Sequence, residues 1–187
     1  MTARYAKIVM TGCLAFFAFL VALTNITDYG GNQPFVQHVL SMDTTFRDPD
    51  VAYRAITTPW LWTLGYLGII AGEVLTAVLM AWAALRMFQA RNASAQSFIA
   101  AKSPVHLAAL SGFLVWFLGF MAIGGEWFLM WQSETWNGQE AAFRFYVSIL
   151  LVLIYVSQPE GDYRECGPRS RGLSQLADHG FVQLPSR

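Results

Sequence analysis

The chain has 187 residues, of which 55% are hydrophobic, 15% aromatic and 13% charged, and its formal net charge is zero. A typical soluble domain carries about 25% charged residues, so this composition indicates a membrane protein of one domain. Zero net charge argues against nucleic acid as a partner, because phosphate binding requires a clustered basic face. The two cysteines, Cys13 and Cys166, lack metal or redox spacing, and we expect no bound metal or cofactor.

Four apolar segments predict membrane-spanning helices, because about 20 helical residues cross a hydrocarbon layer of about 30 Å. They are residues 8–24, 60–85, 105–131 and 140–157. The first segment resembles a signal peptide in outline. Its apolar stretch is longer than a typical signal core, and Leu23–Thr24–Asn25 is a poor cleavage sequence, so we expect a retained helix. The last segment is short for a span and needs its polar ends to reach the required length.

Lysine and arginine residues predict the orientation, because cytoplasmic loops carry the excess of positive charge. Basic residues precede the first segment and lie between the second and third, at Arg4, Lys7, Arg86, Arg91 and Lys102. The connections after the first and third segments are acidic overall. We therefore expect a multi-pass protein of the bacterial inner membrane with both termini in the cytoplasm.

The connection of residues 25–59 is long for a loop without structure of its own. Pro34 follows Asn32–Gln33 in the pattern of a helix cap with proline at the first helical position, and Asp48–Pro49 repeats this pattern. Apolar residues at helical spacing follow each proline. We expect short amphipathic helices in the first outer loop, added to an all-α, four-helix transmembrane bundle.

Glu73 lies within residues 60–85, which are otherwise apolar or small and contain no other charge. An ionised carboxylate facing lipid at this depth costs about 3 kcal/mol or more. We therefore expect Glu73 to face the interior of the bundle. Two roles stay open: a protonated carboxyl hydrogen-bonded between helices, or a group that takes part in proton, ion or ligand chemistry. Helix geometry places Glu73 level with residues 116–120.

Glycines in the second and third segments predict close helix packing, which membrane helices need because lipid provides no hydrophobic drive for association. These glycines are Gly65, Gly68, Gly72, Gly112 and Gly119. Glycine is common in membrane helices, so chance spacing is the alternative.

Polar residues of the outer connections form a second candidate site. They are His38, Asp28, Asp43, Arg54, Glu126 and Gln132. These side chains would line an outer polar pocket. The alternative that we favour is a network at the membrane interface that only holds the loops together, since a lone histidine is more often solvated than a ligand.

Several long and unusual stretches of the sequence are specific enough to suggest a family. They are residues 25–30 (NITDYG), 38–46 (HVLSMDTTF), 124–128 (GGEWF) and 136–140 (WNGQE). They resemble a bacterial family of predicted small integral membrane proteins, a domain of unknown function with four spans. The resemblance covers about residues 1–162 and implies a four-helix inner-membrane protein. It implies no catalytic residue, because the family has no established activity.

Residues 163–187 depart from the family pattern, because its members usually stop near residue 162. The segment is rich in Arg, Gly, Ser and Pro and has no apolar periodicity. We expect a disordered tail, which is an extension rather than an evolved domain.

These features favour a non-enzymatic accessory or structural component in the lipid bilayer, and leave open a homo-oligomer or a larger membrane complex. One alternative is a small proton-coupled transporter that uses Glu73. The other is a quinone- or lipid-binding subunit with a site near Trp131, Glu126 and His38. A haem is not expected, because His38 lies outside and His106 near the cytoplasmic end, so they cannot ligate one iron.

Overall fold

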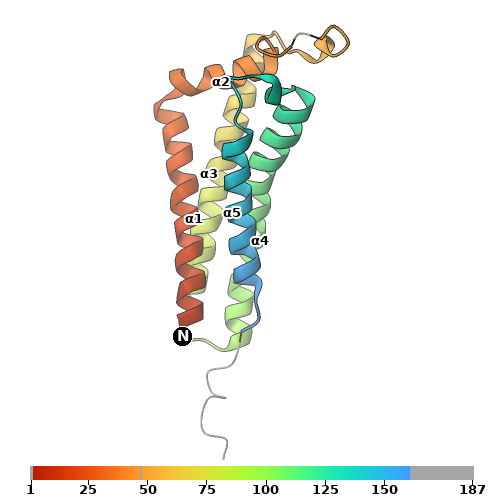
Figure 1. The fold of residues 1–187 in the computed structure, drawn as a ribbon. Coiled ribbons are helices and arrows are strands. Elements are labelled where there is room, and N and C mark those ends of the chain that lie inside the picture. The colour runs from red at the N-terminus through yellow and green to blue at the C-terminus, as the bar shows by residue number, and fades with distance from the viewer. Residues whose placement is uncertain (1, 47, 161–187) are drawn as a thin grey trace, which may run out of the picture.

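The structure is a computed structural model that describes residues 2–46 and 48–160. Figure 1 shows a bundle of long helices with a shorter helix across one end. In chain order the elements are α1 (Thr2–Thr27), α2 (Tyr29–Ser41), the 3-10 turn η1 (Ala52–Arg54), α3 (Pro59–Gln89), α4 (Ala95–Phe113), the π-helical η2 (Leu114–Trp127), the 3-10 turn η3 (Met130–Gln132) and α5 (Gln139–Ser157). The domain boundary expected at residue 162 and the tail of residues 163–187 lie outside the described residues.

Four helical segments of the described chain are long and apolar enough to cross a membrane, namely α1, α3, α4 with η2, and α5. These described residues form helices and no strands, which confirms the predicted all-α four-helix transmembrane bundle. The start of α1, the α3–α4 connection and the end of α5 lie at one end, which we call the terminal end (Figure 1). The opposite end carries α2, and we call it the α2 end.

The helix that contains the third apolar segment begins at Ala95, well before the predicted start at residue 105. The Ser94 hydroxyl caps this helix by accepting a hydrogen bond from Ser97 N at 3.2 Å. Pro104, which directly precedes the predicted start at residue 105, therefore lies inside the helix. The helix ends at Trp127, because Leu129 adopts the left-handed conformation with a φ of 53°.

The element η2 has the wider turns of a π-helix. Its last turn is closed by a hydrogen bond from Phe128 N to Ile123 O, five residues earlier, at 3.0 Å. Such turns are rare and occur frequently at functional sites. Residues of η2 line each of the three cavities described below.

The first outer loop contains one of the two predicted amphipathic helices at full length. α2 begins at Tyr29, before Pro34, which lies inside it. The second predicted helix, after Asp48–Pro49, is only the single turn η1. After this turn Ala55 is extended, and Ile56 N donates to Leu40 O in α2 at 2.7 Å, so this donor is not available to continue a helix.

Small side chains fill the centre of the bundle and allow the helices to approach closely. The central cluster contains six alanines from four helices together with Met80, Trp116 and Ile149. A methyl group added at Gly112 would lie 2.6 Å from Ile149 Cδ1 and 3.2 Å from Trp116. A larger residue at Gly112 would therefore have to displace the end of the Ile149 side chain at this helix crossing.

Charged side chains form a buried cluster at the terminal end. Lys7 and Lys102 are no more than 5% exposed, and both donate from Nζ to Gln158 O, at 2.8 and 2.9 Å. Both also pair with the carboxylate of Glu160, which Lys102 contacts at 3.2 Å. Arg4, 1% exposed, donates to the carbonyl oxygens of Arg91 and Ala93 in the α3–α4 connection. The cluster therefore joins α1, α4 and the end of α5.

Two opposed effects set the pKa of Glu160. Burial acts to raise the pKa, but hydrogen bonds from Lys7 and Lys102 and their charges outweigh burial, so the pKa lies below its ordinary value. A lowered pKa in the folded state means that these ion pairs stabilise the fold above the usual carboxyl range. The stabilisation is lost as the pH falls through the lowered pKa.

We expect Glu160→Ala to lower the free energy of unfolding by about 3 kcal/mol, because it leaves Lys7 and Lys102 buried without their carboxylate. The control is Glu140→Ala, which removes an exposed pair with Arg144 and should cost less than about 1 kcal/mol. Thermal unfolding of both variants in detergent measures the difference. Equal small losses would contradict a stabilising role for the cluster.

Candidate functional site

Glu73 faces the interior of the bundle and is 1% exposed. The buried residues of α3 include Tyr66, Ile70, Glu73, Thr76 and Met80, spaced three or four residues apart. This is the spacing of one face of a helix. Glu73 therefore occupies a core position in an otherwise largely apolar face.

Asn25, near the end of α1, holds the Glu73 carboxyl group. Asn25 Nδ2 donates to Oε1 of Glu73 at 3.0 Å and to Oε2 at 2.9 Å. The Tyr66 hydroxyl, two turns from Glu73 on the same face, donates to the carbonyl oxygen of Asn25 at 2.8 Å. The two bonded groups of Asn25 thus tie α1 to α3 and fix the direction of the carboxyl group.

A cavity of about 200 Å³ lies beside this pair, towards the α2 end, between α1, α2, α3, η2 and α5. Its polar lining consists of Asn25, Asn32, Tyr66 and Glu73. Its aromatic lining consists of Tyr66 with Phe35, Trp116, Phe120 and Phe145. We call it the Glu73 pocket. The presence of Trp116 and Phe120 agrees with the helix levels predicted from the sequence.

The aromatic rings of the Glu73 pocket contact one another as well as the cavity. Phe35 and Phe120 stack with ring centroids 5.9 Å apart, and Trp116 and Phe145 meet edge to face at 5.6 Å. Ring faces attract cations, most strongly where water is excluded. The pocket therefore combines a carboxyl group with the side-chain type that best accommodates an organic cation.

Neither the hydrogen bonds to Glu73 nor the lining of the pocket supplies a positive charge. Both Glu73 oxygens accept hydrogen bonds from the same neutral amide, Asn25, which supplies no positive charge. Among the described residues that line the pocket, none is Lys, Arg or His. A buried carboxylate is stable only with a partner of opposite charge or a proton. The site can therefore hold a cation or a proton at Glu73.

The six polar residues of the second candidate site do not all contact one another. Within the set, His38 and Asp43 form a pair. His38 Nδ1 lies 2.8 Å from Asp43 Oδ2, and the His38 ring stacks on Trp136. Gln132 Oε1 accepts a hydrogen bond from Phe46 N at 3.0 Å. Asp28 occupies the residue before α2.

The other two residues of that site lie near the end of η2. The Arg54 guanidinium group lies over the Trp127 ring, 4.9 Å from its centroid, and donates to the Trp127 carbonyl oxygen at 3.4 Å. Glu126 is exposed. These contacts connect the outer loops to one another. A ligand pocket shared by all six residues stays a prediction.

The five glycines of α3, α4 and η2 have two different surroundings. Gly72 meets the Val115 side chain, and Gly112 meets Ile149, so both lie at close approaches between helices. At Gly68 an added methyl group would have no neighbour within 4 Å, and at Gly119 it would meet only a carbonyl oxygen of its own helix. Gly65 makes ordinary contact with Leu40 and Val36, and Gly65, Gly68, Gly72 and Gly119 all line one groove.

The sequence identifies Glu73 and the level of Trp116 and Phe120, but not the polar neighbours of Glu73. Asn25 belongs to a stretch interpreted only as a family signature, and Asn32 to one interpreted only as a helix cap. The spacing of Tyr66 and Glu73, two helical turns, is a signal that places both on one face. No signal in the sequence pairs Asn25 with Glu73, because the contact depends on how α1 crosses α3.

Four spanning helices around a buried carboxyl group define a small multi-pass integral membrane protein. Residues 3–159 match the family described as predicted small integral membrane protein (DUF2165), and the chain belongs to this family. No curated protein and no solved structure gives a significant match. The family has no assigned function, so the activity must be argued from the site.

Proposed function

We propose that this membrane protein binds a small organic cation, a protonated amine or a quaternary ammonium ion, in the Glu73 pocket. The observation that carries the proposal is the Glu73 carboxyl group, which is buried in an aromatic cavity whose described lining contains no cationic side chain. The cation would pair with the carboxylate and lie against the faces of Phe35, Phe120 and Trp116.

The energetic argument compares the pocket with and without a positive charge. In a low-dielectric interior, an ionised carboxylate bonded only to a neutral amide is costly. A cation that enters the pocket supplies the missing charge, and the Asn25 bonds keep the carboxylate oriented towards it. A cation and a proton would compete for the same group, which is the minimum requirement of proton-coupled transport.

The accessory or structural role favoured by the sequence needs no ligand. In that role the Asn25–Glu73 pair only fastens α1 to α3. A neutral amide at position 73 would still fasten the helices, because Gln has the same size and its Oε1 can accept one of the two hydrogen bonds from Asn25 Nδ2. The two roles therefore differ in whether the charge of Glu73 matters.

Calorimetric titration of the purified protein with benzylammonium, methylammonium and choline tests the proposal, with neutral benzyl alcohol as the control ligand. We expect an ammonium ion to bind and benzyl alcohol not to bind. Glu73→Gln should weaken binding at least about tenfold while the protein stays folded, because a charge-assisted contact is lost. Glu140→Gln, at an exposed position, should leave binding unchanged. Acidification should weaken binding, because protons compete for the carboxylate.

Three results would contradict the proposal: no binding of any ammonium ion, equal binding of benzyl alcohol, or undiminished binding by Glu73→Gln. Each would favour the structural role of the Asn25–Glu73 pair. Size-exclusion chromatography of Glu73→Gln in detergent confirms that a loss of binding is not a loss of folding.

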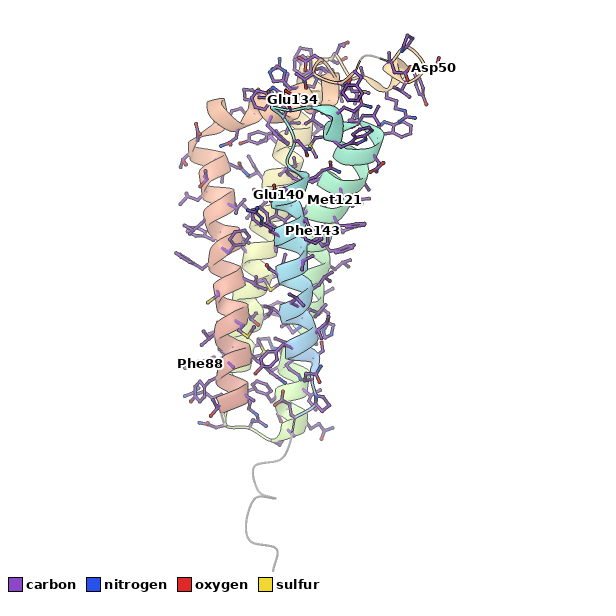
Figure 2. The ribbon with its side chains drawn as sticks, viewed as in Figure 1. Asp50, Phe88, Met121, Glu134, Glu140 and Phe143 are labelled. Atoms are coloured by element: carbon purple, nitrogen blue, oxygen red, sulfur yellow. The ribbon has the colours of Figure 1, made fainter. Side chains whose placement is uncertain are left out.

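We also propose the bacterial inner membrane as the location, with the terminal end in the cytoplasm. The support is the distribution of charge. Arg4, Lys7 and Lys102 belong to the terminal end. Figure 2 shows Asp50 and Glu134 at the α2 end and Phe88, near the α3–α4 connection, at the other. Basic residues on one side predict that this side stays in the cytoplasm.

Fusions to a reporter enzyme that is active only in the periplasm test this orientation. We expect an active reporter after Asp50 and a silent reporter after Arg91, because translocation of the basic α3–α4 connection is disfavoured. A reporter that is cytoplasm-active should show the opposite pattern at the same two positions. Activity of the periplasmic reporter at Arg91 would overturn the orientation.

A further inference from the structure

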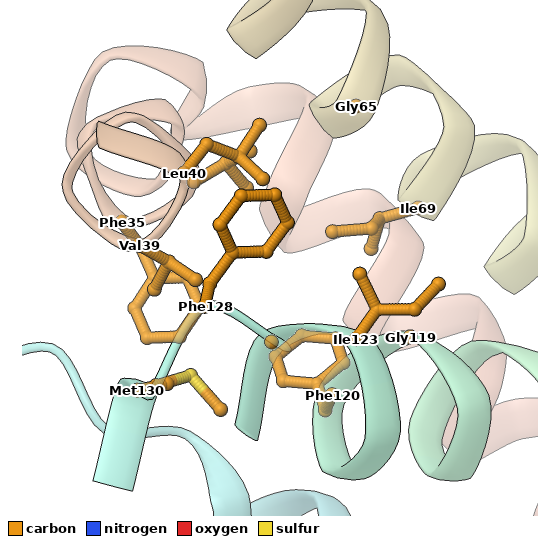
Figure 3. Close-up of a pocket in the computed structure, with 12 residues that line it drawn as sticks. Phe35, Val39, Leu40, Gly65, Ile69, Gly119, Phe120, Ile123, Phe128 and Met130 are labelled. Atoms are coloured by element: carbon orange, nitrogen blue, oxygen red, sulfur yellow. The ribbon is translucent and has the colours of Figure 1, made fainter. Parts of the chain in front are cut away.

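A second cavity lies beneath α2 and differs from the Glu73 pocket in having no polar side chain. Its volume is about 210 Å³, and its walls come from α2, α3, η2 and the turn that follows η2. Figure 3 shows the side chains of Leu40, Ile69, Ile123, Phe128 and Met130 around this space. We call it the apolar chamber. Water is not stable in such a cavity, because it finds no hydrogen-bond partners there.

An apolar groove of about 580 Å³ continues from the chamber along α3 and α4–η2. Gly65, Ile69 and Gly119 line both the chamber and the groove, so the two spaces meet at these residues. The groove is open at Gly68, which is exposed and where no heavy atom lies within 4 Å of the position that a methyl group would take.

The sides of the groove face the hydrocarbon of the bilayer. Leu75, Leu107, Leu110 and Leu114 line the groove and are each about half exposed, at 51%, 57%, 54% and 47%. These leucines belong to helices that span the membrane, so lipid chains are the molecules in contact with them. The groove is therefore open to lipid along its length.

The length and level of the groove match one leaflet of a bilayer. From Gly65 to Leu79 the groove follows α3 for about 20 Å, at about 1.5 Å per residue. Half of a hydrocarbon layer is about 15 Å thick. Gly65 lies near the α2 end of α3, and Leu79 lies past the middle of this helix. A lipid chain that starts near Gly65 and crosses about 15 Å would end near Leu75, so the groove is long enough for the chain of one leaflet.

We propose that the groove and the apolar chamber together bind the acyl chain of a phospholipid from the leaflet on the α2 side. The chain lies along the groove, and its part nearest the headgroup extends into the chamber at Gly65 and Gly119. Bilayer lipid is itself apolar, so the binding does not depend on removal from water. It depends on close packing, because a chain held between two helices contacts protein on several sides.

The inference does not depend on the function proposed for Glu73, because no polar residue of that pocket lines the chamber or the groove. The polar side chain in the groove wall is Ser111, which does not line the Glu73 pocket. The apolar chamber and the Glu73 pocket share apolar walls at Phe35, Val36, Ile69 and Phe120. Glu73→Gln should therefore leave lipid binding unchanged, which separates a failure of one proposal from a failure of the other.

Photocrosslinking in vesicles of phosphatidylethanolamine and phosphatidylglycerol tests the proposal. The vesicles contain a trace of phosphatidylcholine with a diazirine-bearing acyl chain, and mass spectrometry of peptides locates the crosslinks. We expect crosslinks to concentrate several-fold in residues 65–79 and 107–119 relative to the lipid-facing residues of α1 and α5. An even distribution over all four spanning helices would show ordinary solvating lipid and overturn the proposal.

Gly68→Leu fills the groove with an apolar side chain and should reduce crosslinking in both segments several-fold. The matched control is Gly12→Leu in α1, where an added methyl group also has no neighbour within 4 Å. This control should keep the wild-type pattern. Unchanged crosslinking in a folded Gly68→Leu protein would overturn the proposal. If Gly68→Leu does not fold, the distribution of crosslinks in the wild type tests the proposal, together with Gly68→Ala, which should reduce crosslinking in both segments by a smaller factor.

Discussion

The hydrocarbon layer of the membrane sets the constraint on which this structure depends, because it offers no partner for a polar or charged group. The fold places Lys7, Lys102 and Glu160 together at the terminal end, where each cation has a carboxylate and a carbonyl oxygen. Glu73 is the exception, because it lies in the middle of α3. Its two hydrogen bonds from Asn25 give the carboxyl group the polar partner that the hydrocarbon layer cannot provide.

The constraint also divides the interior into two chemically different spaces at the α2 end. The Glu73 pocket has a carboxyl group, two amides and a tyrosine, whereas the apolar chamber has only apolar side chains and glycines. Phe35 and Phe120 belong to the walls of both. A charged ligand and a hydrocarbon chain would thus lie on opposite sides of the same rings, each in the space that matches its chemistry.

Much of the fold is predictable from the sequence, because apolar length and the distribution of charge reflect the bilayer directly. The four spans and the helix after residue 28 follow from these patterns, although Pro34 misplaces the start of α2 and the third span begins ten residues before residue 105. A proline removes one helix hydrogen bond but does not by itself end a helix, and both Pro34 and Pro104 lie inside helices here. The turn at Ala52–Arg54 was expected to be a helix, since apolar spacing alone does not reveal pairing with α2.

The candidate site is predictable only in part. An isolated carboxylate in an apolar segment identifies Glu73, and helix levels identify Trp116 and Phe120 as its neighbours. The partner Asn25 and the cluster around Glu160 depend on contacts between residues far apart in the chain, so no local pattern predicts them. The charges of Arg4, Lys7 and Lys102 suggested orientation in the membrane and gave no sign of burial.

A double-mutant cycle on Asn25 and Glu73 tests the central claim most directly, because the claim is that these two side chains bond each other inside the membrane. The free energies of unfolding of Asn25→Ala, Glu73→Ala and the double variant are compared with that of the wild type in one detergent. We expect the two changes to be non-additive by about 1 kcal/mol, as for hydrogen-bonded neighbours. Additive changes would contradict the pairing, and with it the orientation of the carboxyl group on which the Glu73 pocket depends.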